Sequence, residues 1–142
     1  MTIRNTGEPV ESNRDASDPM GSFRRYADFQ HQKAKWAFLK DGKHVEMVIV
    51  VRISGENLIL LVRGDRDEFV KQLKALIEET DAIGIVYVAG DRGDALTVET
   101  QSRDGQGRNW IEPILRDTSG KPFLGKGIVV VGVSERLGRL FK

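Results

Sequence analysis

Cysteine is absent from the 142-residue sequence, and histidine occurs only twice. Without cysteine the chain cannot form disulfides, thiolate zinc sites, iron–sulfur clusters or a cysteine nucleophile. The two imidazoles, His31 and His44, lack the spacing of a helical metal pair, and no serine stands in a G-x-S-x-G motif. We therefore expect no metal site, no cofactor and no catalytic residue, and we keep an enzyme as an alternative below.

Long apolar runs are also missing. The run 128–131 is bounded by Gly127 and Gly132, and even the longer runs 47–51 and 58–62 have only five residues, whereas a membrane-spanning helix needs about 18 apolar residues. Residues 1–21 are polar and lack the apolar core of a secretory signal. The sequence therefore predicts a soluble, cytoplasmic protein with no membrane partner.

The length and the polar N-terminus together suggest one folded domain preceded by a tail. Domains most often have about 100–150 residues. Residues 1–21 contain two prolines and two glycines among scattered polar residues, with neither a helical nor a strand period. We expect a disordered N-terminal tail over 1–21 and a single α+β domain over 22–142.

Hydrophobic periodicity predicts one strong helix and a series of strands. Asp65 begins the clearest amphipathic helix, 65–80, because it can cap the first turn and Glu68 follows three residues later. Weaker helical patterns lie near the ends, over 22–33 and 134–141. An Asp41-Gly42 turn is expected to join the first two strands. The expected strands are 35–39, 43–54, 58–62, 83–88, 96–101, 109–116 and 127–133.

The order of these elements predicts an α+β fold with a mixed, mainly antiparallel sheet, one well-formed amphipathic helix and weak terminal helices. The third strand, the strong helix and the fourth strand follow one another, so 58–62 and 83–88 are expected to form a parallel crossover pair. These two strands and 127–133 are continuous apolar runs, which is typical of strands buried on both faces. Pro113 cannot donate to a ladder, so strand 109–116 is expected at an edge or a bulge.

Residues 120–127 superficially match the phosphate-binding pattern G-x-x-x-x-G-K. Gly127 replaces the serine or threonine that would hold magnesium. A strand is expected to follow, not the helix whose N-terminus would bind phosphate. We therefore interpret this segment as a hairpin turn.

The leading functional hypothesis follows from the shortage of helices. One helix of about 15 residues covers only part of one sheet face, and each large apolar side chain left exposed forgoes about 1.5–3 kcal/mol. We expect a non-catalytic protein that acts through protein–protein interaction or self-assembly, with a second copy of itself in a homo-oligomer or another protein as partner. A sheet curled into a partial barrel would cover the strands without a partner and stays open.

Two further hypotheses remain. Residues 22–44 carry six basic and two acidic residues interleaved with aromatic residues, a pattern that can bind nucleic acid, although the net charge of +1 argues against a bulk nucleic-acid binder. The other is a small enzyme with a carboxylate/histidine site, and the feature that would support it is convergence of Asp91, Asp94, His31 or His44 in a cleft. The candidate nucleic-acid-binding residues are Arg24, Arg25, Lys33, Lys35, Trp36, Lys40 and Lys43.

Overall fold

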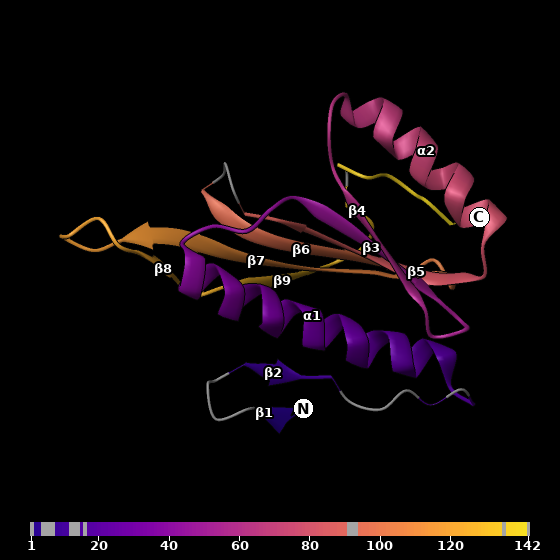
Figure 1. Ribbon diagram of the computed structural model, residues 1–142, viewed down its shortest axis with the longest axis horizontal. Helices are drawn as coiled ribbons and strands as arrows, with labels where there is room; N and C mark the ends of the chain where they lie inside the picture. The colour runs from indigo at the N-terminus through magenta and orange to yellow at the C-terminus, as the bar shows by residue number, and fades with distance from the viewer. Residues whose placement is uncertain are drawn as a thin grey trace.

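The computed structural model describes residues 2–3, 8–11, 15, 17–90, 94–134 and 136–141. Within these residues the chain forms two helices and two sheets (Figure 1). The elements are β1 (Thr2–Ile3), β2 (Pro9–Val10), α1 (Pro19–Asp41), β3 (Met47–Arg52), β4 (Asn57–Leu61), α2 (Arg66–Glu79), β5 (Ala82–Ala89), β6 (Ala95–Ser102), β7 (Gly107–Arg116), β8 (Pro122–Leu124) and β9 (Ile128–Val131).

The large sheet confirms the expected α+β fold. Its strands run in the order β4-β3-β5-β6-β7-β8, with β9 also paired to β7, and every neighbouring pair is antiparallel. The helix α2 joins β4 to β5 as expected, but these strands are not neighbours. Strand β3 lies between them and is antiparallel to both. They therefore run in the same direction without sharing a ladder, and the expected parallel pair is wrong.

Helix α1 is longer than the sequence pattern indicated. The expected helix over 22–33 and the expected strand over 35–39 are both part of one 23-residue helix, so that strand is wrong. Alternation of Trp36 and Phe38 had suggested the strand, but Phe38 continues a helical face. Gly42 ends α1 at φ 75° and donates its N–H to the Phe38 carbonyl, so it is a helix end and not a hairpin turn. The buried face comprises Phe23, Tyr26, Ala27, Gln30, His31, Ala34 and Phe38.

The two faces of the large sheet are covered by different elements (Figure 1). Helix α1 packs along one face, which we call the α1 face, and Phe23 lies so close to Gly84 of β5 that any side chain there would overlap its ring. On the other face, the α2 face, Leu73 and Ile77 of α2 pack over β3 and β5. Asp65 caps α2 by accepting the Glu68 N–H at 3.1 Å, as the sequence predicted.

The C-terminal segment also covers the α2 face, but not as a helix. Residues 136–137 form a turn and 138–141 have no regular structure, so the expected terminal helix is wrong. The Gln101 side chain holds this segment by donating to the Gly138 carbonyl and accepting the Leu140 N–H. Leu137, Leu140 and Phe141 are buried in the core of this face. Tertiary contacts, not a helical ladder, therefore fix the segment.

Strand β7 is interior, contrary to the edge expected from Pro113. It pairs with β6 on one side and with β9 and then β8 on the other. The Pro113 carbonyl accepts the Gly125 N–H at 2.8 Å, so its missing donor also faces the β8–β9 side. Along β7, the pairing with β9 stops at Ile111, the partner of Ile128. The pairing with β8 starts at Ile114, the partner of Leu124. Proline is tolerated because no ladder bond is required at this junction.

The N-terminal residues form a small second sheet, in which β1 and β2 pair antiparallel beside α1 (Figure 1). Helix α1 already begins at Pro19, within the range assigned to the tail. Residues 1, 4–7, 12–14 and 16 lie outside the described residues. The division of the chain into a tail over 1–21 and a domain over 22–142 stays a prediction.

The end of α1 offers a matched test of this packing. Phe38 is 1% exposed and its neighbour Leu39 is 51% exposed. We expect Phe38→Ala to lower the free energy of unfolding by about 3–5 kcal/mol because it leaves a cavity, and Leu39→Ala to change it by about 0.5 kcal/mol or less. Urea unfolding of both variants measures this. Equal losses would contradict the placement of α1.

Candidate functional site

Strand β9 is an exposed edge strand composed entirely of apolar residues. Its four side chains are 44–83% exposed, although the sequence predicted a strand buried on both faces. Val129, the register partner of Trp110, lies on the α1 face, and Val130, the partner of Asn109, lies on the α2 face. Helix α1 passes beside β8 and β9 on the α1 face (Figure 1) but leaves Val129 and Val131 exposed, and α2 packs over β3 and β5 instead. The prediction that this strand is buried on both faces is therefore wrong for the single chain.

Strands β8 and β9 together form one long edge along β7. Their pairing shifts by one residue across the connection 125–127, which is a β-bulge. The segment with the phosphate-loop pattern is thus a turn over 117–121, a strand and a bulge, with no helix after it. Phe123 and its partner Leu115 add exposed apolar side chains on the α2 face. The edge therefore carries exposed apolar side chains at Phe123 and from Ile128 to Val131.

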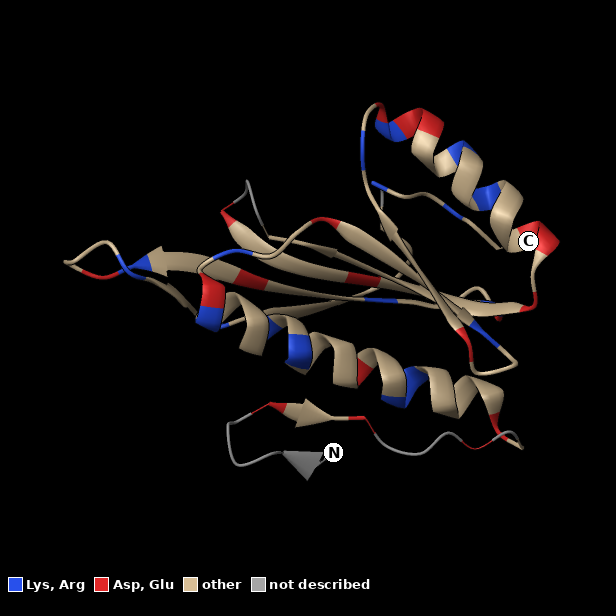
Figure 2. Cartoon of the chain, in the orientation of Figure 1, with Lys and Arg blue, Asp and Glu red and all other residues tan. Residues whose placement is uncertain are grey.

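This edge carries little protection against pairing. Natural edge strands are commonly guarded by charged residues, proline or tight twisting. No charged residue lies within β9, and Figure 2 shows it as an uninterrupted tan ribbon. The bulge and Lys126 interrupt the edge between β8 and β9. Within the described part of the chain, β9 pairs only with β7, so the backbone groups on its outer side are available to another strand.

A buried titratable pair lies between α1 and the sheet. His31 Nε2 hydrogen-bonds to Glu112 Oε1, and both side chains are buried. The imidazole also stacks on Trp110, with ring centroids 4.6 Å apart and planes 11° apart. Burial lowers the pKa of His31 below its ordinary 6.5, although hydrogen bonding and charge from Glu112 act in the opposite direction. The neutral imidazole is therefore favoured in the folded protein.

A second polar group crosses the α2 face. Tyr87, Glu99 and Asn109 are successive cross-strand partners. Burial raises the pKa of Tyr87 to about 12, and its hydroxyl donates to Glu46. Glu99 Oε2 and Asn109 Oδ1 are buried without a hydrogen-bond partner among the described residues, and Arg136 lies 3.7 Å from Glu99. Through Arg136, this group attracts the C-terminal segment electrostatically.

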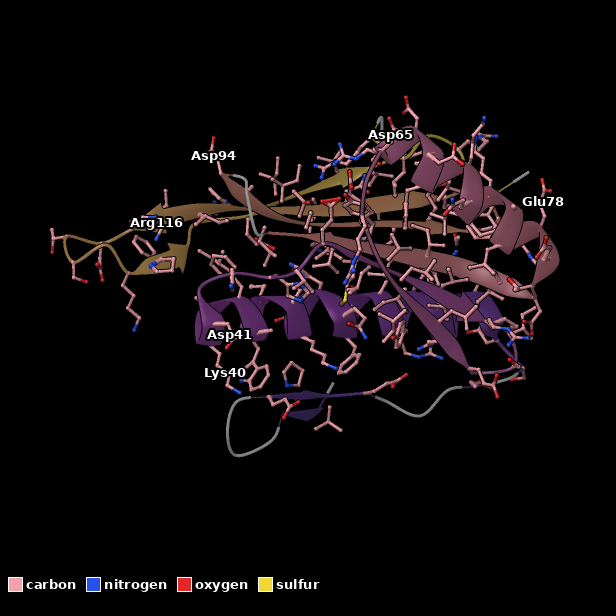
Figure 3. All side chains as sticks on the ribbon, turned by 45° about the horizontal axis from the view of Figure 1, so that its top comes forward. Lys40, Asp41, Asp65, Glu78, Asp94 and Arg116 are labelled. Atoms are coloured by element: carbon pink, nitrogen blue, oxygen red, sulfur yellow. The ribbon has the colours of Figure 1, made fainter. Side chains whose placement is uncertain are left out.

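The candidate nucleic-acid-binding residues spread around α1 and beyond it. Arg24 and Arg25 are exposed near its start, Lys33 and Lys35 follow near its middle, and Lys43 lies past its end. Lys40 covers Trp36, with its Nζ 5.1 Å from the ring centroid, and points away from the sheet (Figure 3). The other α1 aromatics, Phe23, Tyr26, Phe29 and Phe38, are buried. Base stacking here would depend on Trp36, and the nucleic-acid hypothesis stays a prediction.

The proposed carboxylate/histidine site is not assembled by the described residues. His31 is buried against Glu112, whereas His44 lies in the connection after α1, beside Gly90. Asp94 is exposed at the start of β6 (Figure 3), and Asp91 lies outside the described residues. No group of three or more His, Asp or Glu side chains among the described residues is placed to hold a metal ion.

No sequence motif marks the residues of the β8–β9 edge as a site. The signal was nevertheless present, because the run 128–131 is more apolar than an exposed strand requires. Comparisons with protein-family models, with curated proteins and with solved structures find no match. Across the described residues, neither helix has the length and apolar character needed to cross a membrane.

The low pKa of His31 predicts how stability depends on pH. Between the folded-state pKa and 6.5, the unfolded chain binds more protons than the folded one, so acidification destabilises the fold. We expect the free energy of unfolding to fall from about pH 7.5 to about pH 5.5. Urea unfolding at both values should give a smaller fall for His31→Gln than for the wild-type protein. An unchanged fall in His31→Gln would contradict the assignment.

Proposed function

We propose that this protein acts by self-association, in which the β9 strands of two copies pair antiparallel across a two-fold axis. One observation carries the proposal. The run 128–131 has the composition of a strand covered on both faces, yet within one chain it is exposed on both. A second copy supplies the missing cover.

An edge-on partner accounts for β9 better than a face-on partner. A protein packed on the α2 face would contact Ile128 and Val130 and leave Val129 and Val131 in water. A strand added beside β9 contacts all four side chains and also pairs the free backbone groups. Antiparallel pairing of identical strands is self-complementary, as a two-fold interface requires. The same patch then serves both copies.

The length of the β8–β9 edge determines how stable the proposed dimer is expected to be. Stable interfaces bury about 1,200–2,000 Å² in total, and each favourable cross-strand pair contributes about 0.2–1 kcal/mol. Four residues alone form a short ladder, so β8 and the exposed Phe123 beside Leu115 must add contact area. We therefore expect a reversible dimer that dissociates on dilution, and not an obligate one.

Charged substitutions at the two free edges of the sheet test the proposal. Val129→Lys/Val131→Lys places like charges across the β9 pair and should raise the dimer dissociation constant by about tenfold or more. The matched control is Ile59→Lys on β4, the opposite edge, where the side chain is 65% exposed. Native mass spectrometry and sedimentation equilibrium give the subunit number, and urea unfolding checks that each variant is folded.

Two results would overturn the proposal. The first is a wild-type protein that remains monomeric at the highest soluble concentration. The second is a dimer that Ile59→Lys dissociates and Val129→Lys/Val131→Lys does not. Hydrogen exchange gives an independent check, because amides of residues 128–131 that face outward should exchange more slowly in the dimer than in the lysine variant.

A further inference from the structure

A cavity of about 250 Å³ lies between the first half of α1 and strands β6, β7 and β9. Helix α1 contributes Phe23 and Ala27, and the sheet contributes Thr100 and Trp110. Val131 at the end of β9 forms one wall. The interior is therefore mainly carbon. All lining residues come from one chain, so a ligand here does not depend on self-association.

Two arginines line this cavity, and among the described residues no aspartate or glutamate does. Arg24 and Arg108 are both lining residues, while their partners Asp104 and Asp28 are not. The pairs are 3.0 and 3.5 Å long, and both arginines are half exposed. Exposed pairs of this kind contribute little to stability, and each guanidinium has five N–H donors. Both arginines therefore retain donors for an anion.

The chemistry and size together define a ligand class. We infer that this cavity binds a small organic monocarboxylate, with its apolar body among Phe23, Ala27 and Trp110 and its carboxylate between Arg24 and Arg108. A guanidinium matches a carboxylate in geometry, because its donors point in parallel. The volume is below the roughly 300–1,000 Å³ of sites for drug-sized ligands, which restricts the body to one ring or a short chain.

Trp110 supplies a direct readout. Its ring lies between His31 and the Arg108 guanidinium, whose Cζ is 4.9 Å from the ring centroid. A carboxylate drawn to Arg108 changes the environment of this ring. The chain has two tryptophans, so Trp36→Phe leaves Trp110 as the single emitter. Trp36 does not line the cavity.

The experiment titrates full-length Trp36→Phe protein with benzoate and hexanoate as probes, and with benzamide and benzylamine as neutral and cationic controls. We expect saturable changes in Trp110 emission with one or both carboxylates and at least about tenfold weaker binding of the controls. Arg24→Gln should weaken carboxylate binding by a similar factor. Arg25→Gln, the adjacent exposed residue outside the cavity, should leave it unchanged.

Amide chemical shifts provide a second measurement that does not depend on fluorescence. Carboxylate should shift the signals of Ala27, Thr100 and the Trp110 side chain, and leave those of β4 unchanged. The inference is overturned if neither carboxylate binds at millimolar concentration, if benzylamine binds more tightly, or if Arg24→Gln and Arg25→Gln weaken binding equally. None of these outcomes uses the Val129→Lys/Val131→Lys variant, which tests self-association separately and which alters the cavity wall at Val131.

Discussion

The packing of α1 along one face of the large sheet is the contact on which the rest of the structure depends. Its buried aromatic and small residues span from Gly84 of β5 to Glu112 of β7, so one helix binds together strands that are distant in the chain. The other face receives only the shorter α2 and the C-terminal segment, which pack over β3 and β5. Among the described residues no helix covers the α2 face at β8 and β9, where Phe123, Ile128 and Val130 stay exposed.

Much of the fold could be predicted from local pattern. Strands β4 and β5 and helix α2 lie within two residues of their expected limits, because Asp65 and the surrounding periodicity specify them locally. The sequence pattern predicts too early an end for α1. Residues 35–39 alternate between polar and apolar, which is typical of a strand, although Gln30, Ala34 and Phe38 continue a helical spacing of four residues. The neighbours of each strand were not predictable, since the insertion of β3 between β4 and β5 depends on tertiary packing.

The site was less predictable than the fold. Apolar composition could identify 128–131 as a strand, but exposure depends on what the remaining chain leaves uncovered. The partner of His31 lies 81 residues away, and the sequence alone contains no signal that joins it to Glu112. The same holds for Arg24 and Arg108, whose shared cavity exists only because α1 crosses β7. Alternation and charge describe one element at a time, whereas sites form between elements.

The two free edges of the sheet, β4 and β9, differ in a way that affects how many copies can assemble. Beside β4, helix α2 forms a groove of about 620 Å³ with apolar and charged walls on the α2 face, whereas the helix nearest β9 is α1, on the opposite face. When the β9 strands of two copies pair with each other, neither copy has a free β9 edge left, and assembly stops at a dimer. If β9 instead met β4, every added copy would present a new β9, and the sheet would lengthen into a filament. The choice of pairing edge thus decides between a closed dimer and an open polymer.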